Sequence, residues 1–453
     1  MSIPKRPSSG LAVFASCLRL VVALPGSVLL GSCSVNEPAL AQPGGPDDPA
    51  PDAGPGPGGS ASPEAPPRGS GCSPGGRPGT HAFGAFDGCF AGQGFVAVPQ
   101  GDPLPLVDVG GGRVLLVDRS CTIGRYRVVD GSLDPSFGVL GLASIPLLFQ
   151  CDDLRVTRGP GGARALLVEG WSGPLRRLVR LSAEGDLDTS FGEDGVIELG
   201  DARWSADFAG RVTISATTPG GAQISRFTES GSPDPGFEPT ELSWRPSGLA
   251  SDPSGAIFAI GTRHDLGSEG MEIAVVFRSL PEGGPDGTFG DGGLLGLPRV
   301  FGQPTWEERG SWVRTLPSGE VFVATSSHDP EQGTSPGALF RLLPPQAVGG
   351  AWTADLVLLA SRLTCLERTE AGSLILCNST GMKDGPGYAG FVRRGTNGNV
   401  DSRPLHDLSS PGSLVPSLPT TPVPVGDGTA VFATASPQGP LPSPVFMARI
   451  WIE

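Results

Sequence analysis

A short motif recurs along this chain at nearly regular intervals. Its clearest copy is LDTSFGEDGV at Leu187–Val196, where an aspartate is followed three positions later by a phenylalanine and then by two glycines. The aspartates of five copies, at spacings of 47, 54, 46 and 52 residues, are Asp87, Asp134, Asp188, Asp234 and Asp286. The matching phenylalanines are Phe90, Phe137, Phe191, Phe237 and Phe289. A weaker copy begins at Asp401, 115 residues after Asp286, which leaves room for another unit near Gly349.

Two further features share this period. Seven β-rich runs, such as GGRVLLVD and SGEVFVATS, follow a glycine turn at Gly112, Gly162, Gly210, Gly255, Gly319, Gly372 and Gly428. Seven strand-like runs end at or near an arginine, as in RLVRLS and VFMARIWI. Each unit therefore reads as three or four short strands with glycine-containing hairpins and no helical periodicity. This pattern predicts an all-β, seven-bladed β-propeller, with six or eight blades left open because the motif fades after Arg341.

The motif has a physical interpretation. We expect the aspartate to accept backbone N–H bonds in a turn, the phenylalanine to fill the apolar seam between neighbouring blades, and the glycines to supply positive φ angles. The ring is expected to close by pairing Phe95–Val98, as the outer strand of the last blade, with Val445–Ile452. Such pairing removes an exposed sheet edge.

The motif LDTSFGEDGV, together with the glycine-led apolar strand that follows it, resembles the delta-60 β-propeller repeat of bacterial cell-surface proteins. The resemblance covers about Phe83–Glu453 and is strongest at Asp134, Asp188 and Asp286. It implies a propeller fold and an exported location, but it implies no reaction.

The first residues have the pattern of a secretory signal. Positive charges at Lys5, Arg6 and Arg19 precede the apolar run LVVALPGSVLLG, which is too short to span a bilayer. The end of this run, LGSC, resembles a bacterial lipobox, which implies that Cys33 carries the lipid. An ordinary signal peptide with an incidental cysteine is the alternative, and Cys17 is a poorer candidate for lipidation.

A segment rich in proline and glycine follows the signal. Between Ala41 and Thr80, 22 of 40 residues are proline or glycine, so this segment cannot bury enough apolar surface to become ordered. We predict a lipoprotein signal peptide at 1–32, a disordered tether at 33–82 and a propeller at 83–453. Ser34 after the lipidated cysteine resembles lipoproteins of the outer membrane, so we expect an envelope location and a membrane contact through the lipid.

The remaining six cysteines predict disulfides, because their number is even and the chain is expected to be exported. The expected pairs are Cys365 with Cys377, Cys121 with Cys151, and Cys72 with Cys89. No CxxC pair or nearby histidine completes a zinc site, and we predict no cofactor. The formal net charge of −14 argues against a nucleic-acid partner, because the chain lacks a basic footprint for phosphates.

Few residues suggest chemistry, since HExxH and phosphate-loop motifs are absent from the sequence. His264 and His328 follow glycine-led strands of consecutive units, and solvated loop histidines are the favoured interpretation. The acidic turns at Glu193, Asp194 and Asp291 are candidate calcium sites, although their spacing does not match an EF-hand. Solvated turns are favoured here too.

One segment predicts a binding loop. The longest interval between glycine turns contains QPTWEERGSW, with Trp306, Glu307, Glu308, Arg309 and Trp312. We interpret it as an inserted loop, because binding residues concentrate on loops of rigid scaffolds. One or both tryptophans covering the edge of a blade is the alternative, and it is the favoured one.

Two functions agree with these features. The first is a monomeric, lipid-anchored surface propeller that binds a protein or glycan partner. The second is a propeller hydrolase or lyase with a metal in its central channel, which would need histidines and acids converging from several inner strands. The inner-strand segments PLVDV, LRVTR, SWVRT and LTCLE contain no histidine, so the sequence favours the binding protein, with no catalytic residue assigned.

Overall fold

The computed structural model describes residue 87 and residues 90–92, 95–98, 103–145, 147–264, 272–300, 307–328, 336–346, 350–361, 363–369, 371–380, 388–397, 399–404, 422–424, 429–435 and 445–452. All these residues belong to one compact unit. The predicted signal peptide and tether, including Cys17, Cys33, Ser34 and Cys72, lie outside the described residues.

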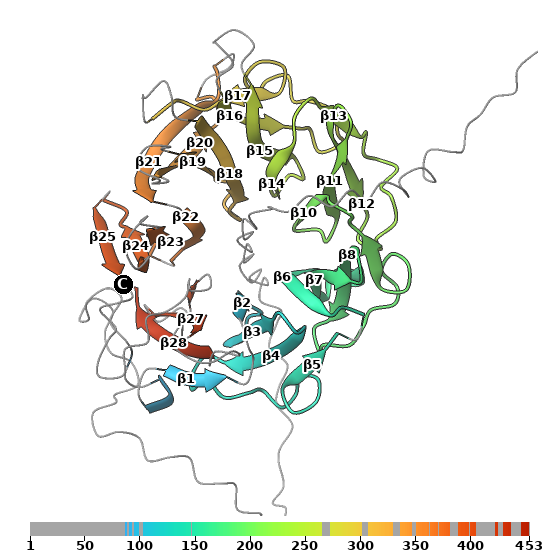
Figure 1. Cartoon of the computed structure of the whole chain (residues 1–453), viewed down its shortest axis with the longest axis vertical. Coiled ribbons are helices and arrows are strands. Elements are labelled where there is room, and N and C mark those ends of the chain that lie inside the picture. The colour runs from blue at the N-terminus through green and yellow to red at the C-terminus, as the bar shows by residue number, and fades with distance from the viewer. Residues whose placement is uncertain are drawn as a thin grey trace, which may run out of the picture. The chain divides into compact units, whose positions relative to one another are not determined.

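Seven four-stranded antiparallel sheets form the blades of a ring (Figure 1). Blade 1 contains β2 (Pro103–Asp108), β3 (Arg113–Asp118), β4 (Thr122–Arg127) and β5 (Leu142–Ser144). Blade 2 contains β6 (Gln150–Arg158), β7 (Arg164–Ser172), β8 (Leu175–Ser182) and β9 (Val196–Glu198). Blade 3 contains β10 (Arg203–Ala206), β11 (Val212–Thr218), β12 (Gly221–Phe227) and β13 (Thr240–Leu242). Blade 4 contains β14 (Pro246–Ser251), β15 (Ile257–His264), β16 (Glu272–Arg278) and β17 (Leu294–Gly296).

The remaining blades continue this order. Blade 5 contains β18 (Glu307–Thr315), β19 (Val321–His328), β20 (Pro336–Leu343) and β21 (Thr353–Ser361). Blade 6 contains β22 (Leu363–Arg368), β23 (Leu374–Thr380), β24 (Tyr388–Arg394) and β25 (Val400–Pro404). Blade 7 contains β26 (Val423–Pro424), β27 (Thr429–Ala435), β28 (Val445–Trp451) and β1 (Phe95–Val98). Within blades 1 to 6 the first strand lies innermost and the last outermost (Figure 1). The prediction of a seven-bladed propeller is confirmed.

The ring closes as the sequence predicts. Strand β1 pairs with β28 in antiparallel register, with Phe95 opposite Ala448 and Val98 opposite Val445. The seventh blade therefore combines the first strand of the domain with its last three, which leaves no unpaired closing strand. Apart from strands, the described residues form two short 3-10 helices, η1 (Phe90–Gly92) and η2 (Pro160–Gly162). Among these residues, no helix has the length and apolar character needed to cross a bilayer.

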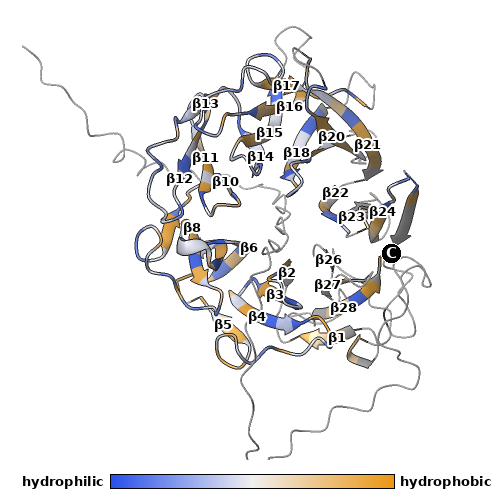
Figure 2. Cartoon of the chain, turned by 180° about the vertical axis from the view of Figure 1, so that it is seen from behind, coloured by the Kyte–Doolittle hydropathy of each residue, from blue (hydrophilic) through white to orange (hydrophobic). Residues whose placement is uncertain are grey.

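The hydrophobic core is divided among the seams of the ring. Hydrophobic residues lie along the strands of the blades (Figure 2). In the described residues they form seven buried clusters, and each cluster combines two neighbouring blades. Each blade carries apolar residues on both faces of its sheet. In a closed ring every blade has a neighbour on each side, so both faces are buried.

The hairpin turns between the first and second strands explain the repeated glycines. In blade 3 the amide of Gly210 donates to the carbonyl of Asp207 at 3.0 Å, and Gly210 has a φ of 86°. Residues other than glycine rarely adopt this conformation. Five more of the predicted turn glycines have φ angles between 67° and 89°: Gly112, Gly162, Gly255, Gly319 and Gly372. Gly428 lies outside the described residues.

Candidate functional site

The repeated corner is an aspartate turn. In blade 2 the carboxylate of Asp188 accepts hydrogen bonds from the backbone N–H and the hydroxyl of Ser190, at 3.0 and 2.6 Å. The amide of Phe191 donates to the carbonyl of Asp188 at 3.2 Å. The aspartates of three other corners accept an equivalent backbone bond: Asp134, Asp234 and Asp286. The aspartate thus fixes the turn that directs the phenylalanine inward.

The five repeat phenylalanines lie in the seams between blades. Phe191 packs with Leu178 of blade 2 and with Trp204 and Val212 of blade 3. Its ring lies close to Gly231, which precedes the next corner in blade 3 and has a φ of 77°. The exposed fraction is 0% for Phe90, Phe137, Phe191 and Phe289 and 5% for Phe237.

Each of these corners has a third member that the sequence motif did not include. Arg180 in β8 donates to Asp188 at 2.8 Å, lies 4.4 Å from the ring centroid of Phe191, and donates to the carbonyl of Glu229 in blade 3. One buried guanidinium therefore joins the turn, the phenylalanine and the next blade. The same aspartate–arginine pair occurs at Asp134 with Arg125, Asp234 with Arg226, Asp286 with Arg278, and Asp87 with Arg449.

The corners of blades 5 and 6 depart from this pattern. Arg393 of blade 6 still donates to a carbonyl of the next blade, that of Ile452, at 3.0 Å. Asp401 lies within strand β25, so the weak copy of the motif is a strand and not a turn. In blade 5, Trp352 packs against Phe289 with ring centroids 5.2 Å apart. Gly349, where a further copy was expected, lies outside the described residues.

Two of the three predicted disulfides are present. Cys121, in the turn before β4, is bonded to Cys151 in β6, so this bridge joins blades 1 and 2. Cys365 in β22 is bonded to Cys377 in β23, directly opposite it across the sheet. Cys72 and Cys89 lie outside the described residues.

The predicted binding loop requires a correction, because the segment from Glu307 onward is strand β18, the inner strand of blade 5. Glu308 is buried and accepts a hydrogen bond from the backbone N–H of Val300 at 3.0 Å. The indole of Trp312 donates to the carbonyl of Leu363 in blade 6 at 3.0 Å, in agreement with the edge-covering alternative. These contacts connect blades and leave neither side chain on a loop.

The other members of that segment, and the histidines, are placed as follows. The guanidinium of Arg309 is 55% exposed and pairs with Glu272 of blade 4 at 2.8 Å. The side chain of Glu307 and all of Trp306 lie outside the described parts. His264 and His328 end equivalent strands, β15 and β19, of neighbouring blades, while their side chains are not described.

Inner strands carry buried carboxylates that the sequence did not reveal. Burial raises the pKa of Asp153 in β6 to about 6, although Arg155 lies 3.0 Å away and opposes this shift, while Glu169 adds to it. Burial raises the pKa of Glu367 in β22 to about 7, against the effect of Arg314 at 2.6 Å. Both acids are therefore paired with arginine, in positions where charge is costly.

The two sets of acids predict how stability depends on pH. At Asp134, Asp188, Asp234 and Asp286, burial favours the neutral carboxyl, but hydrogen bonds and nearby arginines outweigh it and lower the pKa, to about 2 for Asp134. The unfolded chain thus binds more protons below about pH 4, so stability falls there as the pH decreases. For Asp153 and Glu367 the folded chain binds more protons up to pH values of about 6 and 7, so stability falls as the pH rises.

We therefore expect the free energy of unfolding to be greatest between about pH 4 and pH 5. The shift at Glu367 corresponds to about 3 kcal/mol lost between pH 4.5 and pH 7.5. Denaturant unfolding at several pH values measures this loss. In the variant Glu367→Gln, we expect the free energy of unfolding to change less between pH 4.5 and pH 7.5. Unchanged pH dependence in this variant would contradict the assignment.

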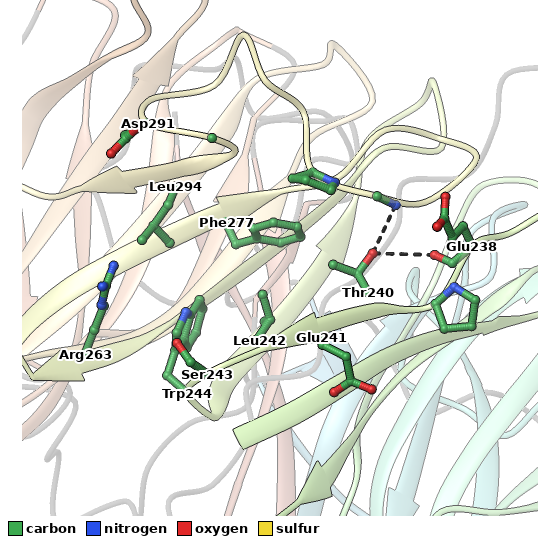
Figure 3. Close-up of a pocket in the computed structure, with 14 residues that line it drawn as sticks. Glu238, Thr240, Glu241, Leu242, Ser243, Trp244, Arg263, Phe277, Asp291 and Leu294 are labelled. Carbon is green, nitrogen blue, oxygen red and sulfur yellow. Dashed lines mark hydrogen bonds between the residues drawn. The ribbon is translucent and has the colours of Figure 1, made fainter. Parts of the chain in front are cut away.

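A pocket of about 420 Å³ lies on the outer rim between blades 3 and 4 (Figure 3). One wall is formed by Glu238–Trp244, which includes β13, and the other by Phe277 of β16 and Leu294 of β17. The walls are connected by the amide of Gly284, which donates to the hydroxyl of Thr240 at 3.0 Å. Glu238 and Arg263 lie at opposite ends of the pocket (Figure 3).

The pocket occurs where the repeat is shortened. In blades 1, 2 and 4 the repeat phenylalanine is followed by a Gly-x-x-Gly turn, whose positive-φ glycines in blade 2 are Gly192 and Gly195, before the outer strand begins. In blade 3 only Glu238 and Pro239 separate Phe237 from β13. The corner of blade 3 is therefore two residues shorter. The sequence PDPGFEP contains this signal, but its consequence for the surface was not predicted.

The candidate calcium ligands are not grouped. Glu193 and Asp194 lie in the corner turn of blade 2, while Asp291 lies in that of blade 4 and lines the rim pocket. Within the described part of the chain, no three histidine, cysteine, aspartate or glutamate side chains are arranged to hold a metal ion.

No protein-family model and no curated protein matches the sequence. The β-propeller domain of Myceliophteria thermophila Cps50 (Swd1) is 9% identical, with a TM-score of 0.43 over 78% of this chain and 98% of that one. Domains 1–2 of Drosophila semaphorin 1a are 10% identical, with a TM-score of 0.42 over 79% and 88%. YCF48, bound to a D1 peptide, is 12% identical, with a TM-score of 0.42 over 82% and 98%. The fold of this chain is established by its own seven sheets.

Proposed function

We propose that this chain is an exported, lipid-anchored β-propeller that binds a protein or glycan partner at the cell envelope. The signal sequence and Cys33 would supply export and the membrane anchor, and residues 33–82 would act as a spacer. The disulfides support export, because such bonds persist mainly in oxidising compartments. A calcium ion is not part of this proposal.

The observation that supports the binding function is a difference in how charged groups are used: they are paired in the seams between blades, but exposed in the rim pocket. Arginines in the seams are paired: Arg180 with Asp188 at a corner, and Arg314 of blade 5 with Glu367 of blade 6. Such pairs make the ring a rigid support. The rim pocket instead has a mainly polar lining and presents the exposed acids Glu238 and Asp291 beside the apolar side chains of Phe277 and Leu294, an arrangement suited to a charged ligand.

Lipid attachment is tested by labelling bacteria that express the chain with an alkyne-modified palmitate. We expect the wild-type protein and the control Cys17→Ser to be labelled and to fractionate with membranes, whereas Cys33→Ser is unlabelled. This result follows because acyl chains can attach to the protein only through the lipobox cysteine. Equal labelling of Cys33→Ser and wild type would contradict the anchor.

Binding is tested separately with the purified protein on two arrays, one of bacterial envelope glycans and one of peptides. We expect saturable binding to members of one array, and loss of that binding after heat denaturation. Absence of saturable binding on both arrays would contradict the binding function, whether or not the lipid is attached.

A further inference from the structure

We propose that the rim pocket between blades 3 and 4 binds an extended peptide segment of a partner protein through an arginine or lysine side chain. This inference rests on the proposed binding function and specifies its partner. At about 420 Å³ the pocket falls within the range of roughly 300–1,000 Å³ that is usual for ligand sites. It can therefore enclose a side chain and part of the adjoining backbone.

The charges of the pocket favour a cation. Three acidic residues line it, Glu238, Glu241 and Asp291, against one basic residue, Arg263. The carboxylate of Glu241 points away from Thr240 and Leu242 (Figure 3), so Glu238 and Asp291 are the acids that a ligand would meet. Glu241 accepts a hydrogen bond from the neutral side chain of Gln223 at 2.6 Å, so its charge is not compensated by that contact. In the described part of the chain, the carboxylates of Glu238 and Asp291 have no ion pair or hydrogen bond. Each carboxylate attracts a cation at 4 Å by about 1 kcal/mol in water, and more beside an apolar wall.

The aromatic residues distinguish a peptide from a glycan. Trp244 and Phe277 line the pocket but are only 8% and 4% exposed, so little of either ring is open to a ligand. Stacking on a sugar ring requires an open aromatic face, which these residues do not offer. A long aliphatic side chain with a terminal cation matches such a pocket, because its methylenes contact the apolar wall while its charge reaches the acids.

The pocket also offers a hydrogen-bond donor. The indole N–H of Trp244 donates to no group in the described part of the chain and is open to solvent, so an acceptor on a partner can reach it. A backbone carbonyl next to the cationic residue would satisfy it. Moreover, β13 is the outermost strand of blade 3, so its outer edge is unpaired within that sheet. An extended segment can follow such an edge.

The test uses the purified full chain and a fluorescein-labelled hexapeptide of alternating arginine and valine, measured by fluorescence polarisation at about 0.15 M salt. The site variant is Glu238→Gln with Asp291→Asn. The matched control is Glu193→Gln with Asp194→Asn, two exposed acids in the corner turn of blade 2. Both double variants lose the same net charge by the same chemical changes, and thermal melts verify that each one folds.

We expect the site variant to bind the peptide at least tenfold more weakly than wild type, while the control stays within twofold. A hexapeptide of alternating glutamate and valine should not bind. Equal weakening in both variants would show non-specific attraction to an acidic protein and would contradict binding in the pocket. The proposal also fails if the site variant binds as tightly as wild type, or if the wild-type chain does not bind the peptide. If the site variant still binds a ligand identified on the arrays, that ligand binds elsewhere on the protein. The pocket proposal is then wrong, while the proposed binding function is retained.

Discussion

Replacing Phe191 with alanine is expected to lower the free energy of unfolding by about 3–5 kcal/mol. The ring is fully buried and belongs to a cluster that combines blades 2 and 3, so its removal leaves a cavity in a seam between two rigid sheets. Sheets held on both sides by other blades cannot collapse to fill that cavity. Denaturant unfolding followed by tryptophan fluorescence, with disulfides intact, measures the loss.

Phe149→Ala is the matched control, because it makes the same chemical change at a side chain that is 60% exposed. It is expected to change the free energy of unfolding by less than about 1 kcal/mol. Losses of the same size in the two variants would mean that the repeat phenylalanines do not anchor the seams.

Much of this fold could be predicted because its repeat is a local physical unit. The aspartate turn needs only the residues from Asp188 to Phe191, and the hairpin turns need a glycine at one position, so both are visible in a single sequence. Ring closure through Phe95–Val98 was also predictable. In a ring of similar blades, pairing the first strand with the last blade leaves no unpaired strand edge at the two ends of the domain.

The arginine of each corner was missed although its signal was present. Arg180, Arg226 and Arg278 each precede the corner aspartate by eight residues, a constant spacing across three units. The strands that end in arginine and the aspartate motif were recognised separately, and their contact depends on the antiparallel return of the chain. Arg449 cannot be found from spacing, because its partner Asp87 lies at the other end of the domain.

The surface was harder to predict than the core. The rim pocket depends on the corner of blade 3, which is two residues shorter than the corners of blades 1, 2 and 4. The sequence shows the shorter corner but not which side chains it leaves exposed. The sequence around Trp312 favours an inserted loop, because it lies in the longest interval between glycine turns and carries aromatic and charged residues. In the structure its polar groups are satisfied by neighbouring blades, through the backbone of Val300 and Leu363, so polar composition does not exclude an inner strand here.

Replacing Arg180 with methionine is expected to cost about 2–4 kcal/mol, because the contacts of a buried guanidinium are lost while Asp188, which is 24% exposed, can still be solvated. Arg180 is 1% exposed and contacts Asp188, the ring of Phe191 and a carbonyl of blade 3. Methionine has a similar length, so the aliphatic packing is largely kept. The loss therefore reports on the polar contacts between blades, and denaturant unfolding measures it.

Arg177→Met is the control on the same strand: Arg177 pairs with Glu198, whose side chain is 63% exposed, and donates a long hydrogen bond to the hydroxyl of Ser172 at 3.3 Å. Such exposed pairs contribute about 0–1 kcal/mol. A double-mutant cycle with Asp188→Asn isolates the ion pair, since asparagine retains the side-chain oxygen that accepts the hydrogen bonds from Ser190. We expect a coupling energy of about 1–3 kcal/mol that disappears as the pH falls and Asp188 is protonated. A coupling energy near zero at neutral pH would show that Arg180 acts by packing alone, and that the corners of the ring are not held together by charge.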